Sequence, residues 1–311
     1  IRAGAIALDV FQRNPRHPGA AHLIIHAFDD PEHAILALPA AKVYADIAPA
    51  AAHALHMPSH IFLQLGMWDP VIQSNKVSYK AALKHAIRKG MERGRSEYHA
   101  LQWYAYGNLQ LENYDDAKWA LDEAMRTYNE FPTQRVRMGT MRMLARYTIE
   151  TERWFGFDHR TMKDADKNHT ALHLVAGLSA IRKGDIAKAE ASLIAIKSAR
   201  KRLEGEPETA YQSRIATIEE YQLEAAIALE KKDKKGAEAF FLEAVRIESG
   251  LTAPSGPPLP MKPSFEMYGE FLVSDGRLGE AEVQFKRALE RTPNRVKSVR
   301  GLKKSRSRPY D

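Results

Sequence analysis

The sequence predicts an all-α protein whose helices come in pairs. Alanine-rich segments with apolar residues at helical spacing run through the whole chain. The alternating β-branched runs that mark strands do not appear. With 311 residues, the chain is long enough for one large core or for an array of helix pairs.

The best-defined pair lies near the C-terminal end. Gly269 is followed after 12, 16, 19 and 24 residues by Ala281, Phe285, Ala288 and Pro293, with Gly276 at the turn. Small residues let two helices approach closely, the aromatic ring fills the space beside them, and the proline stops the second helix. We therefore expect the four alanines Ala117, Ala189, Ala237 and Ala281, which hold the same place in their pairs, to be buried.

The same register recurs at anchor positions 34, 71, 117, 157, 189, 237 and 281. The copies before the last contain His22 with Ala34 and Ala41, Ser59 with Gly66 and Val71, Tyr114 with Ala117 and Ala124, Ala145 with Trp154 and Phe157, Gly177 with Gly184 and Ala189, and Ala225 with Ala237 and Phe241. Residues 251–263 are rich in proline and predict a loop before the last pair.

This register resembles the tetratricopeptide repeat across nearly the whole chain. The stretches HPGAAHLIIHAFDDP (17–31) and HALHMPSHIF (53–62) also resemble a histidine-rich group of bacterial proteins with such repeats. The resemblance implies a single α-solenoid over 1–311: a half repeat at 1–16, about seven helix pairs at 17–293, and a basic capping helix and tail at 294–311. It further implies a scaffold that binds a peptide, protein or small ligand in a concave groove.

In such repeats, defined positions of the first helix of each pair face the groove. The register assigns those positions to His26, His53, His56, His60, His99, Tyr106, Arg142 and Arg146. His22 falls at a packing position, so we expect it to point between the two helices. The strip Arg135, Arg137, Arg142 and Arg146 is either a binding surface for an acidic peptide or phosphate, or a solvated face.

Seven of the twelve histidines lie between positions 17 and 60. His22 and His26, like His56 and His60, are four residues apart and share a helix face. One interpretation is a divalent metal site (Zn, Fe, Ni or Cu), with His26, His53, His56 and His60 as ligands and Asp29 or Asp30 as ligand or outer partner. The alternative is a hydrogen-bonded network that orders a polar groove. His22 and His26 have the spacing of a zinc-protease helix but lack its glutamate, so they do not form that motif. A metal-dependent enzyme that uses the groove of His26, His53, His56 and His60 is the alternative to a binding scaffold.

Local signals complete the reading of this region. Pro58 removes a helical hydrogen bond, so the helix must kink or restart there. Asp30 is expected to cap a helix that Pro31 opens. The four tryptophans, at positions 68, 103, 119 and 154, fall at packing positions and predict core residues.

Composition excludes several classes of protein. The absence of cysteine excludes disulfides, thiolate catalysis and iron–sulfur clusters. Residues 291–311 hold eight basic and one acidic side chain, which accounts for the whole net charge of +7 and leaves 38 of each sign in 1–290. A neutral body does not predict nucleic-acid binding. No apolar run approaches ~18 residues and no signal peptide is visible, so we expect a soluble protein without a membrane span, cytoplasmic, periplasmic or extracellular.

The beginning of the chain predicts either missing sequence or self-association. Ala3, Ala7, Val10 and Phe11 form an apolar stripe that Pro15 closes, as in the second helix of a pair. We expect the natural protein to extend upstream of Ile1, because an uncapped stacking face is costly in water. The alternative is head-to-tail assembly through this half repeat, which would give filaments or rings.

Overall fold

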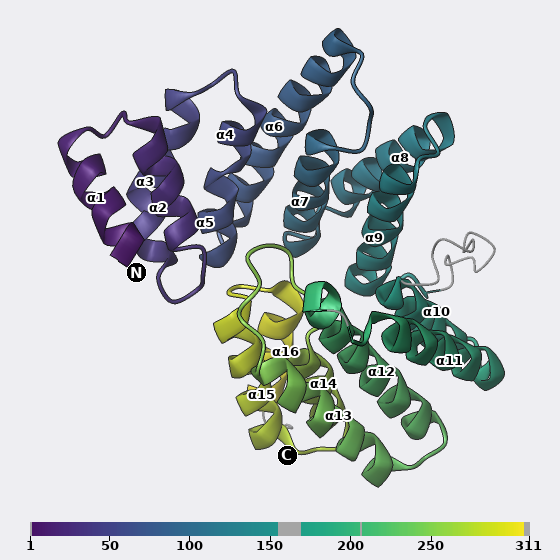
Figure 1. The fold of residues 1–311 in the computed structure, drawn as a ribbon. Coiled ribbons are helices and arrows are strands. Elements are labelled where there is room, and N and C mark those ends of the chain that lie inside the picture. Colours follow the sequence, from purple (N-terminus) through teal and green to yellow (C-terminus); the bar gives the residue numbers. More distant parts are fainter. Residues whose placement is uncertain (1, 155–168, 206, 308–311) are drawn as a thin grey trace. The chain divides into compact units, whose positions relative to one another are not determined.

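The computed structural model describes residues 2–154, 169–205 and 207–307, and the regular secondary structure in these ranges is helical (Figure 1). The chain divides into two compact units. Unit 1 comprises residues 1–143, 253–257 and 290–296, and unit 2 comprises 144–252, 258–289 and 297–311. Each unit is described by itself.

Unit 1 contains the helices that carry the histidines. In order they are α1 (Arg2–Arg13), α2 (Pro18–Ala27), α3 (Ala34–Ile47), α4 (Ala52–His56), α5 (Pro58–Gln64), α6 (Trp68–Lys89), α7 (Ser96–Gln110), α8 (Tyr114–Glu130) and the first part of α9 (Gln134–Thr151). Helices close in sequence pack on one another, as in the pairs α1 with α2, α2 with α3, α5 with α6, α6 with α7 and α7 with α8.

In unit 2, too, helices close in sequence pack on one another. It contains α10 (Thr170–Arg182), α11 (Ile186–Leu203), the short 3-10 helix η4 (Pro207–Thr209), α12 (Ala210–Glu230), α13 (Lys234–Ser249), α14 (Ser264–Ser274) and most of α15 (Leu278–Arg291) and α16 (Val296–Arg306). Sequential packing again dominates, with α10 on α11, α11 on α12, α12 on α13 and α13 on α14.

The predicted helix pairs form where the sequence places them. Gly184 and Gly276 adopt the positive φ that the turns require, at +73° and +80°. The anchor alanines Ala117, Ala189, Ala237 and Ala281 are all at most 1% exposed. At Gly269 an added Cβ would lie 2.9 Å from the ring of Phe285, so α14 and α15 approach at the predicted glycine. The prediction of an all-α protein of paired helices is confirmed.

Local stop and start signals explain several boundaries. Asp185 and Asp233 accept hydrogen bonds from the backbone of Lys188 and Gly236 and so cap α11 and α13. Pro58 is the first residue of α5, which confirms the predicted restart. Residues 251–263 form the predicted loop.

Pro31 does not open a helix, because α3 begins only at Ala34. The Asp30 carboxylate instead accepts hydrogen bonds from the backbone of Glu32 and His33, both at 3.0 Å, and thereby stabilises a turn before the helix.

Two packing expectations need correction as well. On α1 the buried residues are Gly4 and Ala7, while Ala3 and Val10 are exposed, so the packed face is rotated relative to the predicted stripe. The ring of Phe28 lies against Gly4 and fixes that rotation. Trp119 is 45% exposed rather than in the core, whereas Trp68, Trp103 and Trp154 are buried. Phe157, expected in the fourth pair, lies outside the described residues.

In the described part of the chain, no helix combines the length and the apolar character that crossing a bilayer requires.

Candidate metal centre

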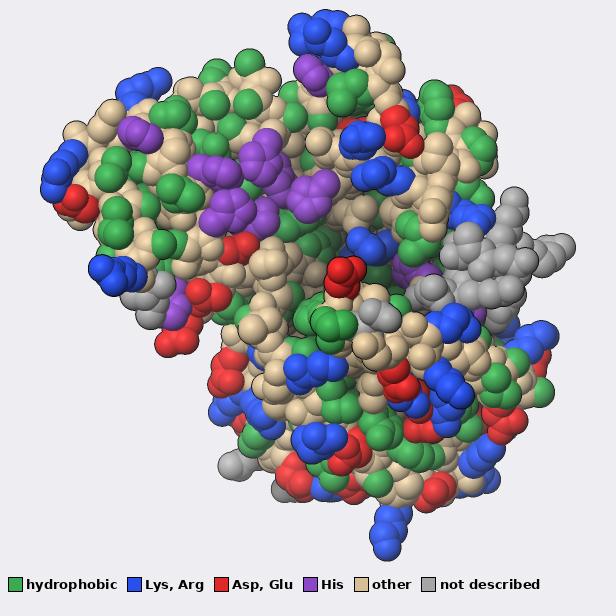
Figure 2. Space-filling model, in the orientation of Figure 1, with side chains coloured by type: hydrophobic (Ala, Val, Ile, Leu, Met, Phe, Trp, Pro, Cys, Tyr) green, Lys and Arg blue, Asp and Glu red, His purple; other side chains and the backbone are tan. Residues whose placement is uncertain are grey.

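Six histidine side chains of unit 1 gather into one cluster. They come from four helices: His22 and His26 from α2, His53 and His56 from α4, His60 from α5 and His99 from α7. Figure 2 shows them as a continuous patch on one face. They form two trios, His22–His26–His53 and His56–His60–His99, and the ligand atoms of each trio lie within 4.8 Å of one another.

The trio of His56, His60 and His99 has the better-defined geometry. The Nε2 atom of His56 lies 3.1 Å from Nε2 of His60 and 2.9 Å from Nε2 of His99. Two nitrogens bound at about 2.1 Å to one ion lie roughly 3.0 to 3.4 Å apart for bond angles from 90° to tetrahedral. The spacing of these nitrogens therefore suits ligands of a single metal ion.

Outer partners fix the orientation of two of these rings. The Nδ1 atom of His60 lies 2.7 Å from the Asp29 carboxylate, which can only accept. The Nδ1 atom of His56 lies 2.7 Å from Oδ1 of the fully buried Asn75, whose Nδ2 donates to the carbonyl of Val71. Both rings therefore carry their proton on Nδ1, and the lone pair of each Nε2 faces the other.

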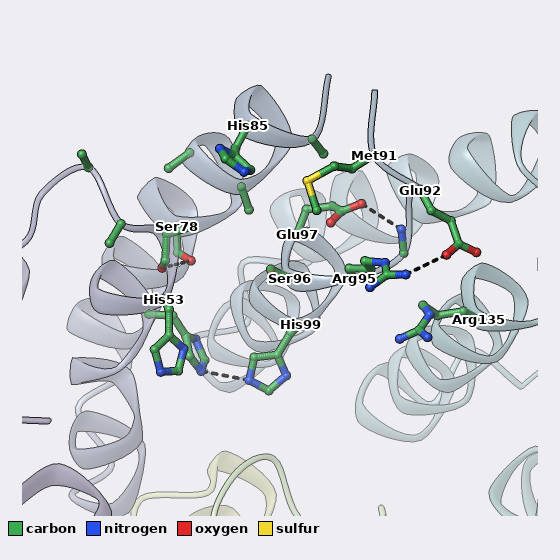
Figure 3. A pocket seen from close by; sticks show the side chains of 18 residues that line it. His53, Ser78, His85, Met91, Glu92, Arg95, Ser96, Glu97, His99 and Arg135 are labelled. Atoms are coloured by element: carbon green, nitrogen blue, oxygen red, sulfur yellow. Dashed lines mark hydrogen bonds and ion pairs between the residues drawn. The ribbon is translucent and has the colours of Figure 1, made fainter. Parts of the chain in front are cut away.

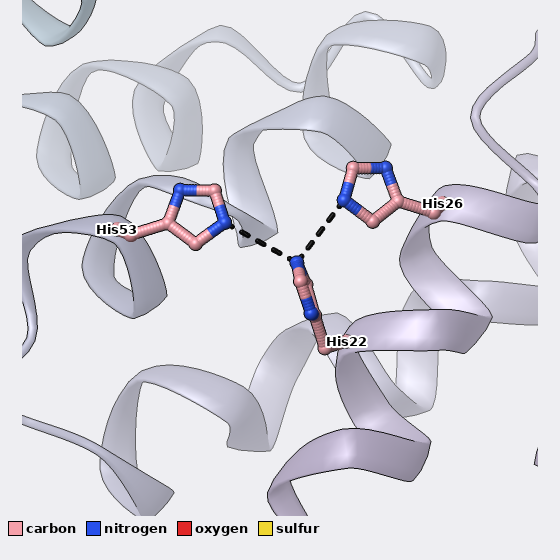
Figure 4. A group of neighbouring side chains, drawn as sticks. All are labelled: His22, His26 and His53. Atoms are coloured by element: carbon pink, nitrogen blue, oxygen red, sulfur yellow. Dashed lines mark hydrogen bonds between the residues drawn. The ribbon is translucent and has the colours of Figure 1, made fainter. Parts of the chain in front are cut away.

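The second trio centres on His22 (Figure 4). Its Nε2 lies 3.0 Å from Nε2 of His26 and 3.2 Å from Nε2 of His53. The ring of His22 also stacks on Tyr44 at a centroid distance of 5.8 Å. The expectation that His22 points into its helix pair holds in part: its ring stacks on Tyr44 of α3 and also contacts His53 of α4 at the cluster.

The sequence explains how four helices converge here. Spacings of four bring His26 over His22 on α2 and His60 over His56 across the break at Pro58. The indole of Trp103 forms a common support, with centroid distances of 4.9, 4.6 and 5.8 Å to the rings of His56, His60 and His99. The small residue Gly256 packs on the other part of this indole, where an added Cβ would lie 2.8 Å from Cζ2.

A buried amide ties the loop to the outer partner of His60. Gln64 is 1% exposed, and its Nε2 donates to the carbonyl of Pro254 at 2.8 Å and to the Asp29 carboxylate at 3.1 Å. Segment 253–257 thus fixes the position of Gln64 through Pro254. Gln64 in turn contacts Asp29, and Asp29 orients the ring of His60. Outer contacts of this kind fix the ring orientation that a metal ion needs.

The surroundings favour the neutral form of four of these imidazoles, those of His22, His53, His56 and His99. Burial, together with the charges of His60 and His99, lowers the pKa of His56 to about 2 although Asn75 acts in the opposite direction. Burial and the neighbouring histidines also lower the pKa of His99 to about 4. The pKa values of His22 and His53 are lowered for the same reasons. Neutral imidazole is the form that binds metal ions.

Several predicted site residues lie elsewhere. Tyr106 is 1% exposed and packs edge-on against Trp68, so it belongs to the core. Arg146 is buried in unit 2 and donates to the carbonyl of Pro258 at 3.0 Å. Asp30 contacts the ring of His33 at 2.9 Å in its own turn, and only Asp29 of the two aspartates contacts the cluster. His17 caps α2 through a 3.1 Å bond from the backbone of Ala20.

Sequence reasoning missed Asn75, Gln64 and the supporting role of Trp103. Asn75 and Trp103 lie inside α6 and α7 with no motif around them, and Gln64 ends α5 just after the histidine-rich stretch. The only available signal was a polar residue at an otherwise buried helical position, which does not reveal its partner.

The fold and this cluster define an all-α protein of sequentially packed helices with two histidine trios suited to metal binding. No protein-family model matches the chain, and no curated protein matches it.

Proposed function

We propose that this protein binds divalent transition-metal ions, one on each histidine trio. The observation that carries the proposal is the opposition of two unprotonated nitrogens, Nε2 of His56 and Nε2 of His60, at 3.1 Å. Two lone pairs at that distance repel unless a cation lies between them. A metal ion supplies that charge, and Asp29 and Asn75 hold the rings in the tautomer that accepts it.

A shared proton is the competing explanation. It would turn one imidazole into an imidazolium that donates to the other, as in a hydrogen-bonded network. Burial and the neighbouring rings lower the pKa of His56 to about 2, so His56 does not hold this proton. Metal analysis distinguishes the two explanations, because a shared proton would leave the trio without bound zinc.

All-nitrogen donor sets suit zinc, copper, nickel or ferrous iron rather than magnesium or calcium. Three protein ligands leave coordination positions open, as in catalytic rather than structural zinc sites. An ion held by His56, His60 and His99 would supply Lewis acidity and would activate water near neutral pH. The proposal therefore includes metal-assisted hydrolysis as the reaction class to which the centre is suited.

The finer architecture is part of the proposal. We infer that the helix pairs are tetratricopeptide-type repeats stacked as a solenoid, which the spacing and burial of Gly269, Ala281 and Phe285 support. Binding of a peptide or protein in a concave groove, and self-association through residues 1–16, stay predictions.

Metal analysis of protein purified without a histidine tag tests the function. After incubation with zinc and desalting, we expect about two ions per chain, and His60→Ala and His26→Ala should each lose about one. The matched control is His85→Ala, which removes an exposed histidine of α6 outside both trios. The proposal would be contradicted if wild-type protein retained no zinc, nickel, copper or iron. It would also be contradicted if His85→Ala lost as much metal as His60→Ala.

A further inference from the structure

A hollow adjoins the candidate metal centre on the side of His99. Its volume is about 260 Å³, and its lining includes Arg95, His99, Gln102, Arg135 and Arg142. A larger cavity of about 730 Å³ is lined by His53, His56 and His99 together with Arg95 and Arg135 (Figure 3). Because Arg95, His99 and Arg135 line both, the two spaces adjoin beside the trio of His56, His60 and His99.

Helical spacing places two arginines at this hollow. Arg135, Gly139 and Arg142 lie four and then three residues apart and so share a face of α9. Gly139 lets α9 approach α7, since an added Cβ would lie 2.7 Å from the ring of Tyr98 and 3.4 Å from Nε2 of Gln102. The missing side chain leaves space between the two arginines, where the hollow lies.

Two of the three arginines that line the hollow, Arg135 and Arg142, have no anionic partner among the described residues. Within the described residues, neither Arg135 nor Arg142 forms an ion pair or a hydrogen bond through its guanidinium. Arg95 is paired with Glu92 at 3.1 Å, and both side chains are about half exposed. The Glu97 carboxylate is already engaged by the backbone of Gly94 at 2.8 Å and by Arg93 at 3.3 Å.

Arg135 and Arg142 are exposed side chains, and both line the hollow together with His99. The charge of Arg142 contributes to lowering the pKa of His99, as expected for two groups on one hollow. Two guanidinium groups on one concave surface are accessible to an oxyanion from solvent, which arginine binds through paired hydrogen bonds.

We infer that this hollow binds the carboxylate or phosphate of a small molecule through Arg135 and Arg142, with the rest of the molecule reaching the metal ion at His56, His60 and His99. The inference rests on the proposed metal-binding function and adds the substrate class. The planar guanidinium fork matches both oxyanions. The lining of the larger cavity also includes Ala51, Ala82, Ala86 and Met91, an apolar part that suits an uncharged body on the same molecule.

Calorimetric titration of zinc-loaded protein tests the inference with three probes of similar size. Benzoate carries a carboxylate, phenyl phosphate carries a phosphate, and benzyl alcohol carries no charge. We expect at least one acid to bind and the alcohol to bind at least tenfold more weakly, because the guanidinium groups recognise the oxyanion. The acid that binds identifies the natural anion.

Arg142→Gln should raise the Kd of the bound acid by about tenfold or more while zinc content stays unchanged. The matched control is Arg126→Gln, which removes one positive charge from an exposed arginine of α8 that pairs with Glu123. It should change the Kd by less than about twofold.

Three outcomes with zinc-loaded protein would overturn the inference. They are that neither acid binds, that the alcohol binds as tightly as the acid, or that Arg142→Gln leaves the Kd unchanged. Absence of zinc uptake would instead be the failure of the proposed function, which the metal analysis reports separately. Binding of an acid to metal-free protein that Arg142→Gln abolishes would support the arginine part of the site on its own.

Discussion

Replacing Asp29 by asparagine isolates the outer contact of the proposed metal centre. The carboxylate of Asp29 accepts from Nδ1 of His60 at 2.7 Å and from Nε2 of Gln64 at 3.1 Å. Asparagine has one acceptor and one donor in the same places. Because Gln64 keeps presenting a donor, the new amide oxygen turns toward Gln64 and the amide nitrogen toward His60. The ring of His60 must then accept at Nδ1 and carry its proton on Nε2.

A proton on Nε2 removes the lone pair that binds the metal. Loss of an outer-shell partner typically lowers metal affinity by about 10- to 100-fold, which corresponds to roughly 1.4 to 2.7 kcal/mol. We expect Asp29→Asn to fall in this range for the ion on the trio of His56, His60 and His99. Competition with a chromophoric zinc chelator measures the two affinities separately.

The adjacent residue supplies the matched control. Asp30 contacts only its own turn and the ring of His33, so Asp30→Asn should leave both zinc affinities within about twofold of wild type. Equal losses in the two variants would mean that the charge of the segment matters and the tautomer does not. An Asp29→Asn protein with unchanged affinity would refute the argument from His60.

Three further predictions concern the pH response and the packing. Zinc release on acidification should be half complete below pH ~6.5, the pKa of free imidazole, because the lowered pKa values of His56 and His99 weaken the competition by protons. Metal analysis after desalting measures this release. Half-release at or above pH ~6.5 would contradict the prediction. Burial raises the pKa of Glu219 to about 7, so between pH ~4.5 and 7 the native state holds a proton that the unfolded state has lost. The free energy of unfolding therefore falls by about 3 kcal/mol as the pH rises from 4.5 to 7. Glu219→Gln should abolish that part of the slope in urea titrations at pH 5 and pH 8, and an unchanged slope would show that the carboxylate is solvated. Ala281→Leu should cost roughly 1–3 kcal/mol because Ala281 is fully buried between α14 and α15, and a neutral result in urea denaturation would contradict the helix contact.

The Glu219 prediction depends on an unusual side chain. Among the residues that the structure describes, neither carboxylate oxygen of Glu219 has a hydrogen-bond partner, and the side chain is fully buried on α12. The hydroxyl of Thr170 lowers the pKa, but its position does not meet the geometry of a hydrogen bond, so desolvation dominates.

The sequence alone determined the helix pairs and one face of the metal centre. Small residues and an aromatic at fixed offsets, as at Gly269, Ala281 and Phe285, define a contact between neighbours in the chain, which depends on local spacing. The four-residue spacings of His22 with His26 and of His56 with His60 are equally local, as is the restart at Pro58. Periodicity therefore sufficed for the fold class and for the pairing of imidazoles on one helix.

Only the tertiary structure decided which helices face one another and what covers them. His22 contacts His53 on another helix, and Tyr106 is buried against Trp68, because the rotation of each helix about its axis depends on the packing of its neighbours. The contact of Gln64 with Pro254 joins residues 190 apart in the chain, and no local pattern specifies it. Periodicity fixes which side chains share a face, whereas the partner of that face is set by contacts between distant parts of the chain. The tautomers of His56 and His60, on which metal binding depends, belong to this second kind of information.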